Sequence, residues 1–224
     1  MTHNMGRHFN MKTHTSQVGM ILLIAAAFVV ALYAYPTLPQ DIVSHWNAAG
    51  VPNGTMPKYL GLLVFPGIMV FIFLISLVLP HIDPLRGIAN FPRAYNAFFF
   101  YLTVFLFYVF ALSLAWNFGA MINLDLALSP ALAALWFFVG VLLPQTHRNW
   151  FVGIRTPWTL SSDAVWNKTH ALGGKLFRTA GLIALLGIFF LNKWFLFFTV
   201  GPVILFAVVL IVYSYVEYRK EERR

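Results

Sequence analysis

Long apolar runs separated by short polar stretches organise this chain. Six runs approach the length of about twenty residues that a helix needs to cross a bilayer: residues 18–35, 59–79, 98–116, 126–143, 176–191 and 194–216. The runs lack the residue-by-residue alternation that is typical of a membrane β-barrel. Because only helices and closed barrels satisfy the backbone in lipid, the pattern predicts an all-α membrane protein with six transmembrane helices.

The composition agrees with this pattern. Hydrophobic residues make up 60% of the chain and charged residues only 10%, against about a quarter charged in soluble domains. The first run has the layout of a signal peptide, but it is longer than a signal core and no small-residue cleavage site closes it. We therefore predict that it is kept as the first span. The sequence contains no cysteine, which excludes disulfides, haem attachment and cysteine zinc sites.

The basic residues fall almost entirely on one side of the predicted membrane. Six spans place both ends of the chain and the loops at 81–97 and 144–175 on one side, which collects every Lys and Arg except Lys58 and Lys193. This bias predicts a multi-pass plasma-membrane protein with both termini in the cytoplasm. The formal charge of +8 then reflects topology and contact with the anionic headgroups of the lipid bilayer, and we predict no direct contact with nucleic acid.

The predicted topology divides the chain into four parts. We expect a cytoplasmic tail (1–17), an N-terminal module with spans one and two and an extracytoplasmic loop (18–93), a pair of spans (94–143) and a C-terminal module (144–224). The longest polar segment of the chain, residues 149–178, lies near the start of the last part. This segment occupies the loop between spans four and five and is the strongest candidate for a cytoplasmic function.

Local patterns subdivide this polar segment. Gly153 permits an unusual backbone angle or close packing, and Thr156 is biased toward extended geometry because Pro157 follows it. The serines at 161 and 162 are suited to cap a helix. We therefore predict a short amphipathic helix in this loop, over about 162–172, with apolar residues at helical spacing on one stripe.

Two interpretations of the predicted helix stay open. In the first, it lies on the inner leaflet with Trp158 and Trp166 as interfacial anchors. In the second, it is a docking surface for a cytoplasmic partner. Trp166 and His170 share one flank because they are four residues apart, and the glycine pair at 173–174 would end the helix and let Lys175 reach headgroups. From the residues alone we favour the interfacial helix.

The predicted outer loop, residues 36–58, is rich in proline and glycine. It carries a compact cluster, His45-Trp46-Asn47, followed by Gly50. An aromatic residue among polar side chains is suited to recognise a peptide or a small ligand. The alternative is a turn-rich loop that folds over the mouth of the bundle, and the pattern does not decide between the two.

Motifs for catalysis and for metal or cofactor binding are absent. The sequence has no HExxH helix, phosphate-binding loop, nucleophile elbow or dinucleotide fingerprint, so we predict no enzyme activity, no metal site and no cofactor. An enzymatic alternative, with His170 acting near Ser161 or Asp163, uses residues that also serve as helix flank and helix cap. The central parts of the predicted spans lack Asp, Glu, Lys and Arg, which argues against ion-coupled transport. A small-molecule or lipid transporter without ion coupling remains as an alternative function, with Arg155 and Lys175 binding phosphates at the inner leaflet.

Both polar loops resemble modules of a known family. The stretch LPQDIVSHWNAAGVPNG resembles the N-terminal module of SdpI-family membrane proteins, although Asn53 stands where an acidic residue is common. The stretch NWFVGIRTPWTLSSDAVWNKTHALGGKLF resembles the C-terminal module of the same family. The positions that match this second module are Gly153, Ile154, Arg155, Thr156, Pro157, Trp158, Thr159, Leu160, Ser161, Trp166, Lys168, Thr169, His170, Gly173 and Gly174.

This resemblance implies a function. It implies an integral membrane immunity and signal-transduction protein that gives resistance to a secreted membrane-active peptide toxin, which is a sporulation-delaying peptide for the family's named member. It also implies relay of the toxin's presence to a cytoplasmic transcriptional repressor, with no enzymatic activity. We expect the extracytoplasmic contact with the toxin at His45, Trp46, Asn47 and Gly50. We expect the cytoplasmic functional loop to use Gly153, Arg155, Thr156, Pro157, Trp158, Trp166, Lys168, His170 and Gly174.

Overall fold

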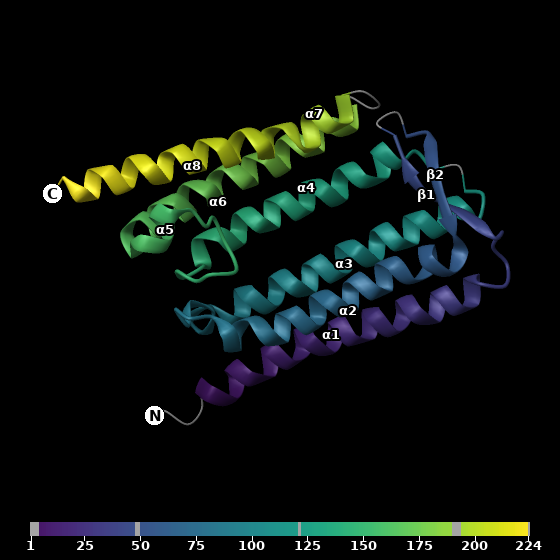
Figure 1. The fold of residues 1–224 in the computed structure, drawn as a ribbon, viewed down its shortest axis with the longest axis horizontal. Helices are drawn as coiled ribbons and strands as arrows, with labels where there is room; N and C mark the ends of the chain where they lie inside the picture. The colour runs from purple at the N-terminus through teal and green to yellow at the C-terminus, as the bar shows by residue number, and fades with distance from the viewer. Residues whose placement is uncertain (1–4, 48–49, 121, 190–193, 224) are drawn as a thin grey trace.

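Six long helices form the body of the protein (Figure 1). The computed structural model describes residues 5–47, 50–120, 122–189 and 194–223, so the predicted outer cation Lys193 lies outside the described residues. The long helices are α1 (Met5–Ala34), α2 (Lys58–Ile82), α3 (Pro92–Asn117), α4 (Leu124–Leu142), α6 (Asp163–Leu186) and α8 (Gly201–Glu222). Shorter elements are η1 (Gly87–Asn90), η2 (Leu143–Gln145), α5 (Pro157–Ser161), η3 (Gly187–Phe189) and α7 (Phe195–Thr199).

The six predicted spans are confirmed. Within the described ranges, six helical segments are long and apolar enough to cross a membrane: Thr15–Ala34, Lys58–Ile82, Pro92–Asn117, Leu124–Gln145, Asp163–Phe189 and Phe195–Glu222. The sixth span combines α7 and α8, and Pro202 stands in the first turn of α8, where a proline costs no helical hydrogen bond.

The helices run side by side in two groups (Figure 1). The helices α1, α2 and α3 form one group, α4, α6 and α8 form the other, and α3 packs against α4 between them. We call the two ends of the bundle the hairpin end, which carries a small β-hairpin, and the loop end, which carries α5. Both ends of the chain lie at the loop end (Figure 1). That this end faces the cytoplasm stays a prediction from the charge distribution.

The outer loop, which we predicted to be rich in turns, forms a β-hairpin. Strand β1 (Asp41–Trp46) pairs antiparallel with β2 (Pro52–Pro57), and the register is irregular around residues 43–46. The turn is closed by Asn47, whose side-chain oxygen accepts a hydrogen bond from the Val51 N–H at 3.0 Å. Gly50 takes a left-handed conformation with φ of 71°, which glycine adopts without steric cost.

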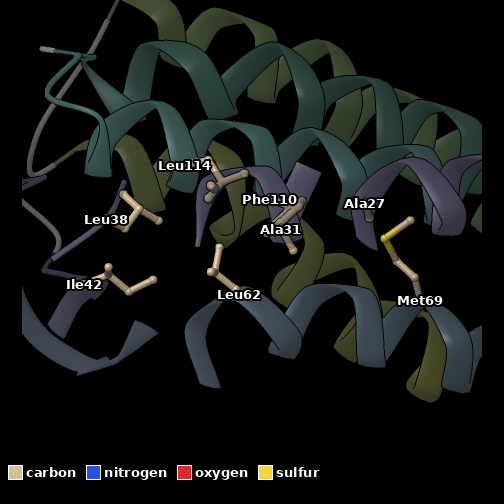
Figure 2. Packing of buried hydrophobic residues seen from close by; sticks show 9 residues of the cluster. Ala27, Ala31, Leu38, Ile42, Leu62, Met69, Phe110 and Leu114 are labelled. Carbon is tan, nitrogen blue, oxygen red and sulfur yellow. The ribbon is translucent and has the colours of Figure 1, made fainter. Parts of the chain in front are cut away.

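Contacts with the first helix group hold the hairpin in place. The Asn117 amide, at the end of α3, accepts from the Val43 N–H at 2.8 Å and donates to the Val43 carbonyl at 3.0 Å. Ile42 is buried beside Leu38 and Leu62 in the cluster that fills the space between α1, α2 and α3 (Figure 2). The hairpin is therefore an extension of the α1–α3 core.

The short helix predicted over 162–172 is not a separate element. These residues form the first turns of α6, which continues without a break to Leu186, and the short helix in this loop is α5, which lies immediately before them. The glycine pair at 173–174 does not end the helix, contrary to the prediction. A Cβ on Gly174 would lie 2.9 Å from the Gly140 carbonyl oxygen and would overlap Cγ of Pro144. Gly174 instead permits the close approach of α6 to the end of α4, and Gly173 packs against the Ile154 side chain.

The continuous α6 also moves the charges relative to the predicted span. Lys175 and Arg178 stand near the middle of the segment Asp163–Phe189, whereas the predicted span began at Leu176. Contact with α4 shows the depth of Arg178, which packs beside Gly140, near the loop end of the span Leu124–Gln145. Its Nε donates to the Gly174 carbonyl at 2.9 Å, so the side chain extends toward the loop end.

Candidate functional site

The loop that leads into α5 is shaped by one buried amide. Asn149 is fully buried, and its NH₂ group donates to the carbonyls of His147 at 2.8 Å and Val152 at 2.9 Å. Its oxygen accepts from the N–H groups of Phe151 at 2.8 Å and Val152 at 2.7 Å. Asn149 therefore satisfies the backbone of a turn that has no regular secondary structure. The sequence does not indicate this role, because asparagine in a polar loop is usually exposed.

Gly153, Trp166 and His170 form a tightly packed group behind this turn. Gly153 has φ of 123°, and a Cβ at this position would lie 2.5 Å from Nε2 of His170 and 3.1 Å from the Trp166 ring. The two rings stack with centroids 4.0 Å apart. Both parts of the prediction for Gly153, the unusual backbone angle and the close packing, are confirmed.

The hydrogen bonds of His170 define its tautomer. Nε2 accepts from the Ile154 N–H at 2.9 Å, and Nδ1 lies 2.8 Å from the Trp166 carbonyl oxygen. Because a carbonyl only accepts, Nδ1 carries the proton and the ring is neutral. With both nitrogens occupied by the backbone and the side chain only 1% exposed, His170 is a structural residue here.

Trp166 is not the interfacial anchor that we predicted. Its side chain is 0% exposed, and Nε1 donates to the Thr146 carbonyl at 3.1 Å. An amphipathic helix packed against protein has the same sequence pattern as one packed against lipid, and here the apolar face meets the loop after α4. Trp158 is half-buried and contacts Tyr215 of α8 with ring centroids 5.1 Å apart.

Thr156 begins α5 and connects it to α8. Its backbone is extended, as Pro157 predicts, with φ of −111° and ψ of 162°. Thr156 and Thr159 form a reciprocal capping box, in which each side-chain oxygen accepts from the backbone N–H of the other. The Thr156 hydroxyl also lies 3.0 Å from the Ser214 hydroxyl. A helix of only five residues thus depends on its cap and on α8.

We expect Thr156→Val to destabilise the protein by about 1–2 kcal/mol, because it removes the cap and the bond to Ser214 while keeping the branched shape. Thr156→Ser keeps the hydroxyl and is the matched control. Thermal unfolding of the purified protein in detergent should show a lower midpoint for the valine variant only. Equal midpoints would show that the cap contributes nothing.

Ion pairs connect the loop end of α6 with α8. Nζ of Lys168 and Nζ of Lys220 each lie 2.7 Å from a different oxygen of the Glu217 carboxylate, whose side chain is only 7% exposed. Ser162 donates to Glu221 at 2.6 Å. A polar cavity of about 410 Å³ opens here. Lys168, which we predicted to act in the functional loop, is therefore ion-paired with Glu217, a partner that the sequence pattern does not indicate.

The remaining arginines of the loop differ in exposure. Arg148 pairs with Asp163 at 2.8 Å and donates to the Leu160 carbonyl at 2.9 Å. Arg155 is exposed and donates to the Trp150 carbonyl at 2.7 Å. Trp150 itself is half exposed. Arg155 and Trp150 are thus exposed side chains of this loop and, with His147 and Asp163, are accessible to a partner at the loop end.

The predicted extracytoplasmic residues lie at the opposite end, in the hairpin. Nδ1 of the exposed His45 side chain lies 2.6 Å from Oδ1 of Asn53. Trp46 packs edge-on against Trp116 with ring centroids 5.8 Å apart, and its buried indole N–H has no hydrogen-bond partner within the described ranges. Asn47 and Gly50 form the turn described above. The structure therefore gathers the two predicted groups at opposite ends of the bundle, and their roles stay predictions.

These features define a multi-pass integral membrane protein of the cell membrane, with a hairpin at one end and a tightly packed polar loop at the other. The sequence model of the SdpI/YfhL protein family matches residues 145–214, which begin in the loop after α4 and end at Ser214. A second model, described as a domain of unknown function (DUF1648), matches residues 22–70 and includes the hairpin.

The full-length comparison agrees with the family matches. The chain is 24% identical over 201 residues to "Immunity protein SdpI" of Bacillus subtilis (strain 168), which covers 89% of this chain and 94% of that protein. No solved structure matches significantly. The resemblance to the SdpI family is therefore confirmed, and the chain is a multi-pass membrane protein that is similar to Immunity protein SdpI over most of its length.

Proposed function

We propose that this protein is an immunity protein that protects a bacterial membrane against a secreted membrane-active peptide toxin. The observation that carries the proposal is the similarity to Immunity protein SdpI, which extends over 89% of this chain and 94% of that protein. The similarity thus includes both the hairpin and the loop between α4 and α6. A protein that shared only a membrane-spanning scaffold would not need both polar modules.

In this proposal the hairpin meets the toxin. The charge bias predicts that the hairpin end lies outside the cell, and contacts of Asn117 and Ile42 hold the hairpin strands on the α1–α3 core. The exposed His45 and the hollow of about 470 Å³ lined by Trp116, Gly119, Ala120, Ile122 and Asn123 offer polar and apolar contacts at that end. A rigid surface binds with little loss of conformational entropy.

The loop between α4 and α6 is the second part of the proposal. It relays the presence of the toxin to a cytoplasmic partner, such as a transcriptional repressor, through the exposed Arg155 and Trp150. Relay requires that the toxin bind one arrangement of the helices more tightly than another. The α5–α8 contacts, Thr156 with Ser214 and Trp158 with Tyr215, supply a connection that such a rearrangement would change.

A protection assay tests the proposal. A sensitive bacterium that expresses the protein is challenged with the sporulation-delaying peptide and a panel of other membrane-active antibacterial peptides. We expect the inhibitory concentration of at least one peptide to rise by about tenfold or more, and His45→Ala to reduce that rise. Tyr33→Ala, at an exposed position on α1, is the matched control and should protect fully.

Equal sensitivity of cells with and without the protein, at membrane levels confirmed by immunoblot, would refute immunity against the whole panel. Protection that is independent of His45 would instead move the contact away from this part of the hairpin.

A lipid or small-molecule transporter is the alternative. An apolar cavity of about 460 Å³ opens between α3, α4 and α6 and is lined by Tyr101, Pro130, Ala133, Ala134, Phe137, Phe138, Val141, Gly181, Leu182 and Leu185. It is large enough for part of an acyl chain. Transfer of a fluorescent phospholipid between the leaflets of proteoliposomes, faster than in protein-free liposomes, would favour this alternative.

A further inference from the structure

Asp83 is a buried carboxylate outside both matched modules. It follows α2 as the helix C-cap and is only 4% exposed. Oδ1 accepts from the Leu85 N–H at 3.4 Å, and Oδ2 accepts from the Ile88 N–H at 3.2 Å. Arg86, in the same turn, has φ of 52°, and such a conformation persists in a non-glycine residue only when its surroundings fix it. Asp83 thus shapes the turn between α2 and α3.

The same carboxylate also reaches the other helix group. Its Oδ1 accepts from the backbone N–H of Trp150 at 3.2 Å, across 67 positions of sequence. Trp150 begins the segment that the buried Asn149 folds and that leads into Gly153 and Arg155. The turn of the first group and the loop of the second group therefore share one hydrogen-bond acceptor.

Two further contacts close the same joint. A Cβ on Gly87 would overlap the Arg148 carbonyl oxygen, so the two backbones touch here. The Phe91 ring stacks on His147 with centroids 6.3 Å apart and an interplanar angle of 23°. At the loop end, the two helix groups are thus joined by backbone contact and ring stacking beside the Asp83 carboxylate, which accepts hydrogen bonds from both groups.

We propose that Asp83 is a positioning residue that couples the α2–α3 turn to the segment 147–152 and so sets the shape in which Arg155 and Trp150 are presented at the loop end. Movement of the first group, which carries the hairpin, is transmitted to the loop through this joint. The relay consequence rests on the function proposed above, whereas the positioning role does not.

Hydrogen exchange of the purified protein tests the positioning role. In Asp83→Ala the Trp150 amide loses its acceptor, and we expect exchange over 147–152 and 85–88 to accelerate by about tenfold or more, while α4 and α6 keep their protection. In Asp83→Asn a single side-chain oxygen remains. At the Oδ1 position it keeps the bonds to Leu85 and Trp150 and loses the one to Ile88. We therefore expect Trp150 to stay protected and Ile88 to exchange faster. Glu222→Gln, at an exposed ion pair with Arg219, is the control and should change neither segment.

The asparagine variant keeps the test informative if the alanine variant fails to fold. Unchanged exchange at 147–152 in the alanine variant, or equal acceleration throughout the chain, would overturn the proposal, because the second outcome describes only a loss of stability. Equal acceleration of amide exchange at Trp150 and Ile88 in the asparagine variant would also overturn the proposal.

The protection assay also allows a test of whether Asp83 affects the relay to the cytoplasmic partner. If the protein protects cells, we expect Asp83→Ala to reduce binding of the cytoplasmic partner, measured by co-purification after peptide challenge, at unchanged membrane levels. If no peptide gives protection, the proposed function fails, and the exchange experiment still decides whether Asp83 positions the loop.

Discussion

Gly153→Ala is expected to lower the free energy of unfolding by at least about 2 kcal/mol. Two costs add. A side chain at φ of 123° is strained by about 1–3 kcal/mol, and the new Cβ would lie 2.5 Å from Nε2 of His170, an overlap of the kind that costs about 1–3 kcal/mol. Relief of the overlap moves His170 away from the Ile154 N–H and loosens the segment that presents Arg155.

Gly119→Ala separates the two costs. Gly119 also has a positive φ, 89°, but nothing lies within 4 Å of its Cβ position. This control should therefore show the backbone strain alone. The two variants are compared by unfolding in increasing denaturant in one detergent. Equal destabilisation would show that the packing of Gly153 against His170 and Trp166 contributes nothing to stability.

Gly181→Leu is expected to have the second large effect, a destabilisation of about 3 kcal/mol. A Cβ on Gly181 would lie 2.7 Å from the Ala133 carbonyl oxygen and 2.8 Å from the Phe137 nitrogen. Both atoms belong to the α4 backbone, so rotation of a side chain cannot relieve the overlap. The helices α4 and α6 must separate, and with little hydrophobic force between helices in lipid their association depends on this close contact.

Gly67→Leu is the matched control for this effect. Gly67 lies inside α2, is exposed on the bundle surface, and has nothing within 4 Å of its Cβ position. Leucine there gains helix propensity of up to about 1 kcal/mol, so this variant should be as stable as the parent or more so. The midpoints of thermal unfolding should thus shift in opposite directions. A loss of stability at position 67 as large as at 181 would contradict the role of the α4–α6 crossing.

The membrane spans could be predicted because lipid imposes a length and an apolar composition on each helix. The starting point of α6 could not, because residues 163–175 are polar and their burial depends on contacts with α8 and the loop after α4. Glu217 shows why. Its pairing with Lys168 depends on the register between two helices whose paired residues are 49 positions apart in sequence, and an isolated sequence pattern does not contain that register.

The hairpin and the inner packing were missed for related reasons. The strand DIVSHW is short, lies between prolines and lacks a regular alternation, so turn residues dominated the prediction. His170 and Trp166 were placed correctly on one helical flank, but whether that flank met lipid or protein depended on a turn built by Asn149. Gly153 was the exception, since glycine in a polar segment indicates a conformational requirement directly.

The structure separates what the loop needs for its shape from what it offers to a partner. Residues Gly153, Thr156, Trp166 and His170 are buried or packed, and substitutions there are expected to act through folding. Arg155 and Trp150 are exposed and are expected to act through contact. Functional tests of the loop should therefore begin with the exposed pair, at equal membrane levels.

The proposed immunity function is tested most directly by the membrane potential of sensitive cells during challenge with the sporulation-delaying peptide and the peptide panel, followed with a voltage-sensitive dye. We expect cells with the protein to keep their potential at a concentration of at least one peptide that depolarises cells without it. We also expect His45→Ala to shorten this protection, whereas Tyr33→Ala should not. Depolarisation by every peptide at the same rate and concentration in cells with and without the protein would contradict the proposed immunity function.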